Sequence, residues 1–292
     1  MDEIGTAATP DRVNARSWQG EIADGDRFAF GANWAAFLRH LDEDRIQRAE
    51  KSLGDAFGRD SLVGLRFLDI GSGSGLFSLA AHKLGASVTS FDYDPESVAC
   101  TQALRDRFAR GGDEWRVLQG SVLESDFMAS LGAFDIVYSW GVLHHTGSMW
   151  VAIANAASAV APEGLFDLAI YNDQGPASRR WKQIKKAYIK MPRGLKWAVL
   201  GPAFLRLWGP TMLRDALRGK PFHTWRNYEA EGTARGMHPW RDVVDWVGGY
   251  PFEVAKPEEI FEFCRERGFE LLKLRTCGGG LACNEFVFRR TR

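Results

Sequence analysis

A glycine-rich loop flanked by two acidic residues is the part of this sequence best suited to chemistry. The loop reads Asp69-Ile70-Gly71-Ser72-Gly73-Ser74-Gly75, and Asp92 follows its last glycine by 17 residues. Such a loop between a strand and a helix brings the backbone close to a nucleotide-like ligand. The GxGxG spacing differs from the GxGxxG that seats a pyrophosphate, and Asp69 would repel one. Asp69 suits an ammonium group instead, and Asp92 suits the two hydroxyls of a ribose.

Two adjacent histidines, His144 and His145, follow a continuous apolar segment. Histidine is the commonest acid-base side chain, and neighbouring residues point in different directions, so we expect at most one of the pair to face an acceptor. A helix cap or a buried structural hydrogen bond is the alternative role. Since no third ligand is near them in sequence, we predict no metal site. Asp173 is a second candidate base, with turn formation as its alternative role.

Alternating strands and helices place these residues along one edge of a sheet. Strands are expected at 65–70, 87–91, 115–119, 134–140 and 165–171, with helices at 28–57, 76–83, 95–108 and 149–160. This alternation predicts an α/β fold with a doubly wound, mostly parallel sheet, in which ligands bind at the carboxyl ends of the strands. A helix at 257–267 and two strands at 269–274 and 285–289 follow. Their short glycine-rich turn predicts an antiparallel C-terminal hairpin, which completes seven strands.

The chain is expected to divide into four parts. Residues 1–60 form a tail and a helical N-terminal lid, and residues 61–172 form a Rossmann-like core. Residues 173–256 lack the strand alternation and read as an inserted helical cap, and residues 257–292 complete the core with a helix and a β-hairpin. The segment Phe30–Trp34 of the lid is placed to close over a bound ligand.

Charge is unevenly distributed although the formal net charge is zero. Residues 174–226 hold thirteen Lys and Arg and one acid, Asp215, which indicates a negatively charged partner. Arg179, Arg180 and Trp181 suit a phosphorylated, nucleotide-linked or carboxylated acceptor. A solvated basic helix whose tryptophans fill the cap's own core, or a single-stranded nucleic acid site, are the alternatives. Glu253 either lines the acceptor site or pairs with a cap arginine.

From residue 65 to 171, and more loosely from 257 to 288, the chain resembles the class I S-adenosylmethionine-dependent methyltransferases, particularly the bacterial ubiquinone and menaquinone methylases. The glycine loop, Asp92 and the His-His pair carry the resemblance. It implies S-adenosylmethionine as cofactor and S-adenosylhomocysteine as product. The implied cofactor contacts are Asp69, Gly71, Ser72, Gly73, Gly75, Asp92, Tyr93, Ser121, Val122, Ser139 and Trp140. Ser121 stands where this family usually has an acid for the adenine amino group, and a hydroxyl binds that group more weakly than a carboxylate does.

These observations predict methyl transfer to an oxygen, nitrogen or sulfur of a small, anionic metabolite. The expected base is His144, His145 or Asp173. The expected acceptor contacts are Tyr171, Arg179, Arg180, Trp181, Trp246 and Glu253. An RNA methyltransferase, a nicotinamide-dependent oxidoreductase and a non-catalytic binding protein are the alternatives.

The sequence also bears on cellular setting. No apolar run reaches the ~18 residues of a membrane helix, and the N-terminus has no signal pattern. The four cysteines form no CxxC pair, which favours reduced thiols over disulfides or zinc. We therefore expect a soluble, cytoplasmic monomer or homodimer with no membrane span.

Overall fold

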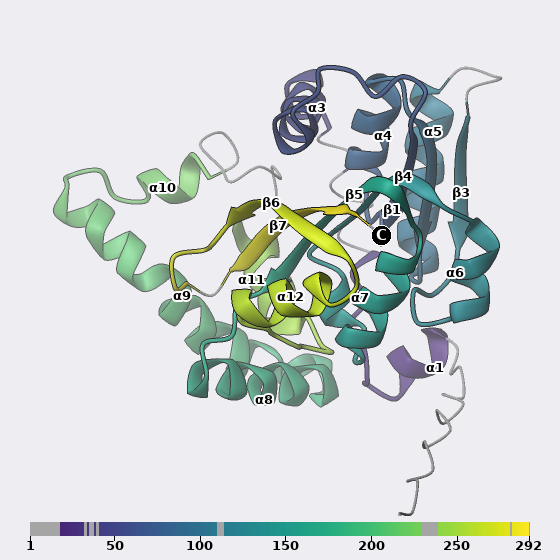
Figure 1. Ribbon diagram of the computed structural model, residues 1–292. Helices are drawn as coiled ribbons and strands as arrows, with labels where there is room; N and C mark the ends of the chain where they lie inside the picture. Colours follow the sequence, from purple (N-terminus) through teal and green to yellow (C-terminus); the bar gives the residue numbers. More distant parts are fainter. Residues whose placement is uncertain are drawn as a thin grey trace, which may run out of the picture.

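Seven strands form one sheet in the order β3-β2-β1-β4-β5-β7-β6, as the computed structural model shows (Figure 1). The structure describes residues 18–31, 34, 38, 41–109, 114–228, 239–280 and 282–291. The strands are β1 Arg66–Ile70, β2 Ser87–Asp92, β3 Trp115–Gln119, β4 Phe134–Trp140, β5 Val160–Tyr171, β6 Phe269–Arg275 and β7 Cys283–Arg290. Strands β1 to β5 pair in parallel, whereas β7 runs antiparallel to β5 and β6. The predicted α/β fold with a C-terminal hairpin is confirmed.

Helices cover both faces of this sheet and bury a separate apolar core on each. One face carries α3 Glu43–Phe57, α4 Leu76–Lys83 and α5 Pro95–Phe108. The other carries α6 Ser125–Leu131, α7 Met149–Ser158 and α12 Pro257–Arg265. Because parallel strands are buried on both faces, they are continuous apolar segments, as β4 illustrates.

The inserted segment between β5 and α12 forms a helical cap with a core of its own. Its elements are α8 Pro176–Lys190, η2 Arg193–Leu195, α9 Trp197–Leu217, α10 His223–Arg226 and α11 Pro239–Gly248. Trp181, Trp208, Val247 and Phe252 are among the buried residues that hold it together. A short helix, α1 Trp18–Ala23, precedes the core, and a 3-10 turn, η1 Leu143–His145, follows β4. None of the helices in the described ranges is long and apolar enough to cross a membrane.

Helices α4 and α5 and strands β3 and β4 have the bounds that the sequence predicts, and β1, β2, β6, β7, α7 and α12 differ from theirs by one or two residues at an end. Three further elements differ more. The single helix expected from 28 to 57 is wrong as one element, because Gly31, Trp34 and Leu38 are helical but residues 41 and 42 are not. The Asp42 side chain accepts a hydrogen bond from Arg45 N and begins α3 at Glu43. Strand β5 begins at Val160 rather than at residue 165, and its pairing with β4 shifts register between Phe134 and Ile136. Helix α6 is missing from the prediction, because its seven residues make only about two turns, which is too short for a helical pattern of apolar residues to stand out. The division of the chain at residues 60, 172 and 256 stays a prediction.

Candidate active site

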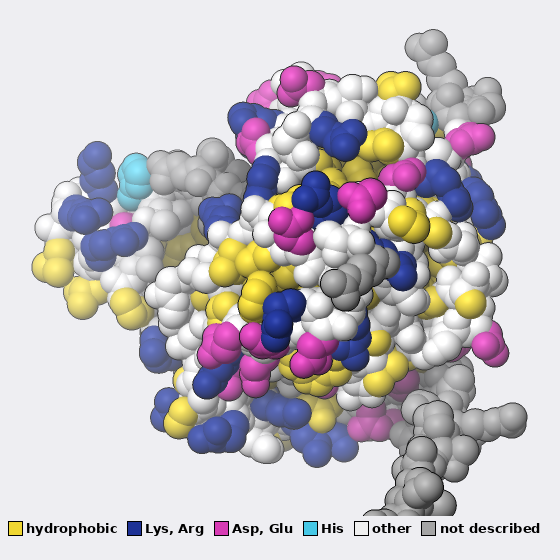
Figure 2. Space-filling model, in the orientation of Figure 1, with side chains coloured by type: hydrophobic (Ala, Val, Ile, Leu, Met, Phe, Trp, Pro, Cys, Tyr) yellow, Lys and Arg dark blue, Asp and Glu magenta, His cyan; other side chains and the backbone are white. Residues whose placement is uncertain are grey.

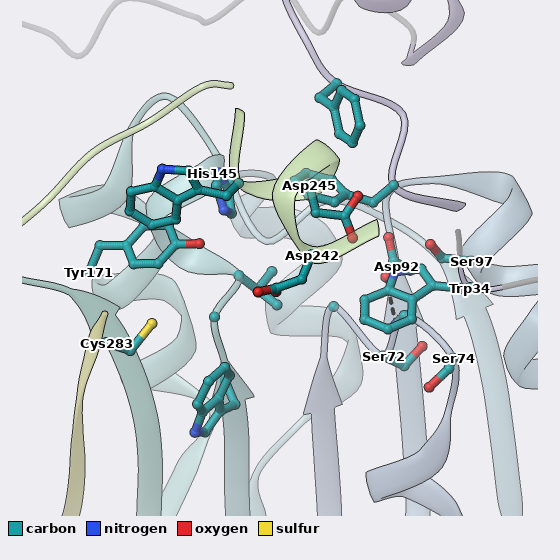
Figure 3. Close-up of a pocket in the computed structure, with 18 of the residues that line it drawn as sticks. Trp34, Ser72, Ser74, Asp92, Ser97, His145, Tyr171, Asp242, Asp245 and Cys283 are labelled. Carbon is teal, nitrogen blue, oxygen red and sulfur yellow. Dashed lines mark hydrogen bonds between the residues drawn. The ribbon is translucent and has the colours of Figure 1, made fainter. Parts of the chain in front are cut away.

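One cavity of about 1030 Å³ lies between the carboxyl ends of the strands and the cap (Figure 3). Ligand sites usually occupy ~300–1,000 Å³, so this cavity has room for two small molecules side by side. Its walls come from the N-terminal segment, the loops after β1, β2, β3 and β4, the end of β5, helices α9 and α11, and the turn between β6 and β7. The candidate site therefore lies where a doubly wound sheet is expected to bind ligands.

The glycine loop forms the floor of one side of the cavity. Gly71 has φ +76°, and a Cβ there would lie 2.3 Å from Val142 Cγ1. Its N–H and that of Ser72 both donate to Phe91 O, at 2.8 and 3.1 Å, which ties the end of β1 to β2. Gly71, Ser72 and Gly73 line the cavity as predicted. Gly75 is not among the lining residues, because it caps α4 with φ +80° and packs against Thr101, 3.0 Å from the position of a Cβ.

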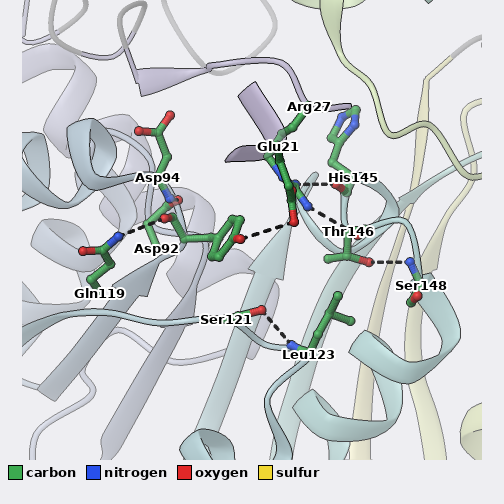
Figure 4. Close-up of polar contacts among 11 residues, drawn as sticks. Glu21, Arg27, Asp92, Asp94, Gln119, Ser121, Leu123, His145, Thr146 and Ser148 are labelled. Carbon is green, nitrogen blue, oxygen red and sulfur yellow. Dashed lines mark hydrogen bonds and ion pairs between the residues drawn. The ribbon is translucent and has the colours of Figure 1, made fainter. Parts of the chain in front are cut away.

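Asp92, at the end of β2, lines the cavity and is partly shielded from solvent (Figure 4). One carboxyl oxygen accepts from Gly73 N at 3.0 Å and the other from Asp94 N at 2.9 Å. Burial is the largest effect on this group, and it raises the pKa of Asp92 to about 6. Desolvation disfavours the charged form of Asp92, so hydrogen bonds donated by a bound ligand would stabilise its carboxylate.

Asp69 lines the same side and belongs to a buried polar chain. The Ser78 hydroxyl donates to Asp69 Oδ2 at 2.5 Å and lies 2.7 Å from the Ser90 hydroxyl. The Trp115 indole N–H donates to that same Ser90 oxygen at 2.9 Å. This chain fixes the carboxyl group of Asp69 at the end of β1.

The remaining predicted cofactor contacts fall into two groups. Tyr93, Ser121, Val122 and Trp140 line the cavity. Ser139 does not, because its side chain is fully buried and its hydroxyl donates to Ile70 O at 3.1 Å. Ser121 Oγ accepts from Leu123 N at 3.2 Å, so part of its acceptor capacity is used within its own turn.

Of the two histidines, His145 lines the cavity and His144 lies outside it. His144 is fully buried, and its Nδ1 accepts from Tyr171 N at 3.3 Å. His145 Nδ1 lies 2.7 Å from Pro251 O. Because a carbonyl only accepts, Nδ1 carries the proton and Nε2 carries the lone pair. Burial and the nearby charge of Lys185 lower the pKa of His145 to about 3, so this histidine is neutral.

Tyr171 and Trp246 line the cavity, whereas the other predicted contacts on the acceptor side lie outside it. Arg179 and Arg180 are exposed on the outer face of α8, and Trp181 is buried in the cap core. Asp173 accepts from Gly175 N at 2.7 Å, which is the turn-forming alternative. Glu253 accepts from Met149 N at 3.0 Å and so caps α7, and no ion pair with a described cap arginine accompanies it. The orientation of α8 excludes Arg179, Arg180 and Trp181 from the cavity, whereas Asp173 and Glu253 lie in loops and bond to nearby backbone N–H groups.

Several lining residues were not singled out from the sequence. On α11, Asp242 and Asp245 are three residues apart and share the cavity face with Trp246, a helical spacing that would have grouped them. Tyr228 OH donates to Asp242 at 2.8 Å. Figure 3 shows both carboxyl groups in the space between His145 and Tyr171 on one side and Asp92 on the other.

The N-terminal segment closes the cavity from above through contacts that join distant parts of the chain. Arg27 pairs with Glu21 and donates to the carbonyls of His145, at 2.8 Å, and Thr146, at 3.4 Å (Figure 4). Tyr93 OH donates to Glu21 at 3.3 Å. Phe28, Phe30 and Trp34 also line the cavity, and Gly31 N donates to Asp94 at 2.8 Å. Residues 32 and 33 of the segment expected to close over the ligand lie outside the described residues.

This chain is similar in sequence to known methyltransferases. Residues 68–166 match the family model described as a methyltransferase domain. The ubiquinone biosynthesis O-methyltransferase of Caulobacter sp. (strain K31) is 29% identical, over 73% of this chain and 86% of that protein. The protein of the same name from Xanthomonas campestris pv. campestris (strain B100) is 30% identical, over 69% of this chain and 85% of its own.

Solved structures of methyltransferases are also similar to this chain, at lower sequence identity. Magnesium protoporphyrin IX methyltransferase from Synechocystis PCC 6803 with bound S-adenosylhomocysteine is 16% identical, with a TM-score of 0.49 over 84% of this chain and 83% of its own. An N-methyltransferase from Bradyrhizobium japonicum WM9 is 15% identical, with a TM-score of 0.48 over 86% and 100% of the two chains.

Proposed function

Because this chain belongs to the class I S-adenosylmethionine-dependent methyltransferases, we propose that it methylates a small aromatic acceptor held between His145, Tyr171 and the cap. S-adenosylmethionine is the methyl donor of this family. The observation that carries the proposal is that one continuous cavity joins the glycine loop and Asp92 to an aromatic chamber, by which we mean the part lined by Trp140, Tyr171, Trp208 and Trp246. Family membership sets aside the nicotinamide-dependent oxidoreductase.

The cofactor is proposed to lie over the glycine loop. Gly71 and Gly73 line the cavity with backbone that a ligand can approach, and Asp92 offers carboxyl oxygens to the ribose hydroxyls. Asp69 is proposed to hold the ammonium end, and Ser121 and Val122 the adenine. When bound, S-adenosylmethionine supplies an electrophilic methyl group whose bond to sulfur breaks as the acceptor bonds to its carbon, leaving a neutral thioether.

The acceptor is proposed to be aromatic and hydroxylated. Tyr171, Trp140, Trp208 and Trp246 line its side of the cavity, which suits a flat apolar ring. The curated relatives are named as O-methyltransferases of ubiquinone biosynthesis, which favours oxygen over nitrogen or sulfur.

An anionic acceptor, predicted from the bases of α8, loses its support because Arg179 and Arg180 face away from the cavity. The cavity is lined by the acids Asp242 and Asp245 and by the bases Arg27, Arg214 and Arg275. Arg27 is paired with Glu21 and Arg275 with Glu285, and the carboxylates of α11 favour a positively charged cofactor.

His145 is proposed as the general base. Its Nε2 holds the lone pair, so it accepts the acceptor's hydroxyl proton as the new bond forms and then releases that proton to solvent. The contact between Nδ1 and Pro251 O fixes the ring during this step. A cytoplasmic location and a monomeric or dimeric state stay predictions from the sequence.

Purified protein tests the proposal in two stages. Calorimetry compares S-adenosylmethionine with NAD, and we expect micromolar uptake of the first only. Methyl incorporation is then measured on catechols, other phenols, amines, thiols and phosphorylated sugars. Arg179→Gln/Arg180→Gln should leave the KM of the preferred acceptor unchanged. If the protein instead prefers phosphorylated acceptors and loses that preference in the double variant, the proposed aromatic acceptor is wrong and the predicted anionic acceptor is right.

An RNA methyltransferase remains the second candidate, because the bases of α8 are exposed and available to a polyanion. Methyl incorporation into total RNA tests it. Incorporation that is lost in the same double variant would favour RNA over a small acceptor.

A further inference from the structure

The outer face of α9 and the turn after it expose large apolar side chains. We call residues 193–226 the arm, which contains η2, α9 and α10 and extends away from the sheet in Figure 1. The exposed fractions are 57% for Leu195, 72% for Trp197, 68% for Leu205, 63% for Leu213, 81% for Leu217 and 48% for Phe222. Single exposed leucines are ordinary, but a series along one projecting helix marks an interaction surface.

Positive charge accompanies this apolar series. The arm carries Arg193, Lys196, Arg206, Arg214, Arg218, Lys220 and Arg226. Its one acid, Asp215, is buried and accepts hydrogen bonds from the backbone and hydroxyl of Thr224. Figure 2 shows apolar side chains along the lower edge of the arm and Lys and Arg side chains above them. The exposed surface of the arm is therefore apolar and basic.

We propose that the arm docks on the surface of a membrane containing anionic lipids. Leu, Trp and Phe beside Lys and Arg are the composition of helices that lie in the headgroup region. Tryptophan is favoured at that depth, since its ring is apolar and its N–H is polar. Anionic headgroups supply the negative charge that balances the Lys and Arg side chains of the arm.

Charge also argues against a second copy of this chain as the partner that covers the exposed face of the arm. A symmetric dimer through this face would set the basic arm against its own equivalent, and like charges in contact oppose association. A lipid surface has no such conflict. An acidic protein partner is an outcome that the experiment separates.

The inner side of the same helix reaches the candidate active site. Leu207, Trp208 and Thr211 line the cavity, and they lie along α9 between the exposed Leu205 and Leu213. A docked arm thus holds the cavity beside the bilayer. This part of the inference rests on the proposed function, and it makes the acceptor an apolar molecule drawn from the lipid phase.

Vesicle co-sedimentation of the full chain tests the docking. The probes are vesicles of phosphatidylcholine alone and vesicles with about a third phosphatidylglycerol, at low and high salt. We expect binding to the anionic vesicles that weakens as salt rises, because exposed charges are screened. Leu205→Ser/Leu213→Ser/Leu217→Ser should lower partitioning about tenfold or more, since three exposed side chains that would enter the bilayer lose their apolar contact with lipid.

Matched variants control for loss of apolar surface and of charge. Val63→Ser/Val151→Ser/Leu272→Ser removes exposed apolar side chains elsewhere and should bind vesicles as the wild type does. Arg206→Gln/Arg218→Gln/Lys220→Gln should weaken binding, whereas Arg179→Gln/Arg180→Gln/Lys186→Gln on α8 should have a smaller effect. Equal losses in the two charge variants would overturn the assignment to the arm, as would vesicle binding unaffected by the leucine triple variant.

Two further readouts separate the explanations. Sedimentation velocity reports self-association, and a dimer that dissociates in the leucine variant, with no vesicle binding by the wild type, would overturn the lipid surface. S-adenosylhomocysteine affinity, measured by calorimetry without vesicles, should be equal in all variants. Vesicle binding without any cofactor affinity would leave the docking intact and refute the proposed function.

Discussion

At the scale of single residues, Asp92 joins two opposing requirements. The ribose contact that we propose for Asp92 needs a carboxylate, whereas burial favours the neutral acid and raises the pKa of Asp92 to about 6. The folded pKa lies above the unfolded value near 3.8. Stability from this group is therefore complete below that value and is lost as the pH rises through about 6.

Cofactor affinity and stability should consequently respond to pH in opposite directions. As the pH falls from 7.5 to 5, we expect the Kd for S-adenosylhomocysteine to rise about tenfold, which calorimetry measures. The free energy of unfolding of the ligand-free wild type should increase relative to that of Asp92→Asn over the same interval. Asp92→Asn should bind weakly at every pH, and an undiminished affinity in that variant would remove Asp92 from the cofactor site.

His145 gives a second prediction at this scale. His145→Gln preserves a donor toward Pro251 O but has no basic nitrogen, so kcat should fall by about 10²–10⁴. The Kd for S-adenosylhomocysteine should change little. Because the pKa of His145 is about 3, the wild-type kcat should show no loss from this group down to pH 5. His223→Gln on α10 is the control, and an equal fall in both variants would indicate a structural cause.

At the scale of elements, the packing of α8 against α11 contains a buried lysine. Lys185 donates to Trp246 O, and its Nζ lies 4.3 Å from the Trp246 ring centre and 4.7 Å from that of Phe252. Burial lowers the pKa of Lys185 from 10.5 to about 7, partly countered by Asp245. The aromatic faces offset some of the desolvation.

This arrangement predicts a pH-dependent stability of the cap. Between about pH 7 and 10.5 the unfolded chain holds a proton on Lys185 that the folded chain lacks, so raising the pH stabilises the fold. From pH 7 to 9, urea unfolding should show the wild type gaining about 1–2 kcal/mol relative to Lys185→Met. Lys182→Met, exposed on the same helix, should show no such difference, and parallel curves for wild type and Lys185→Met would refute the buried charge.

At the scale of the whole molecule, the N-terminal segment links the two halves of the site. Arg27 bridges Glu21 to the carbonyls that follow β4, and Glu21 contacts Tyr93 after β2. Arg27→Met should release this segment and speed dissociation of S-adenosylhomocysteine by roughly tenfold, measured by stopped flow. Lys190→Met, which removes only the surface pair with Asp26, is the control. Unchanged dissociation in Arg27→Met would leave the segment without a closing role.

Local signals made the core of this protein predictable. The glycine loop, the buried strands and the helix starts at Pro95 and Pro257 depend on neighbours within a few residues, so α5, β3 and β4 matched their predicted bounds. Gly71, Asp92 and His145 reached the cavity because a parallel sheet gathers its strand ends at one edge.

The direction of the cap side chains depended on contacts distant in sequence. Helix α8 is basic and aromatic throughout, and its composition alone allows either face to be buried. Packing against α11 turns Trp181 and Lys185 inward and leaves Arg179 and Arg180 in solvent. On α11, Asp242 and Asp245 face the cavity. The sequence by itself determined the family, the sheet and the cofactor edge. Only the tertiary structure decided which cap residues face an acceptor, because helix rotation is fixed by burial against distant elements.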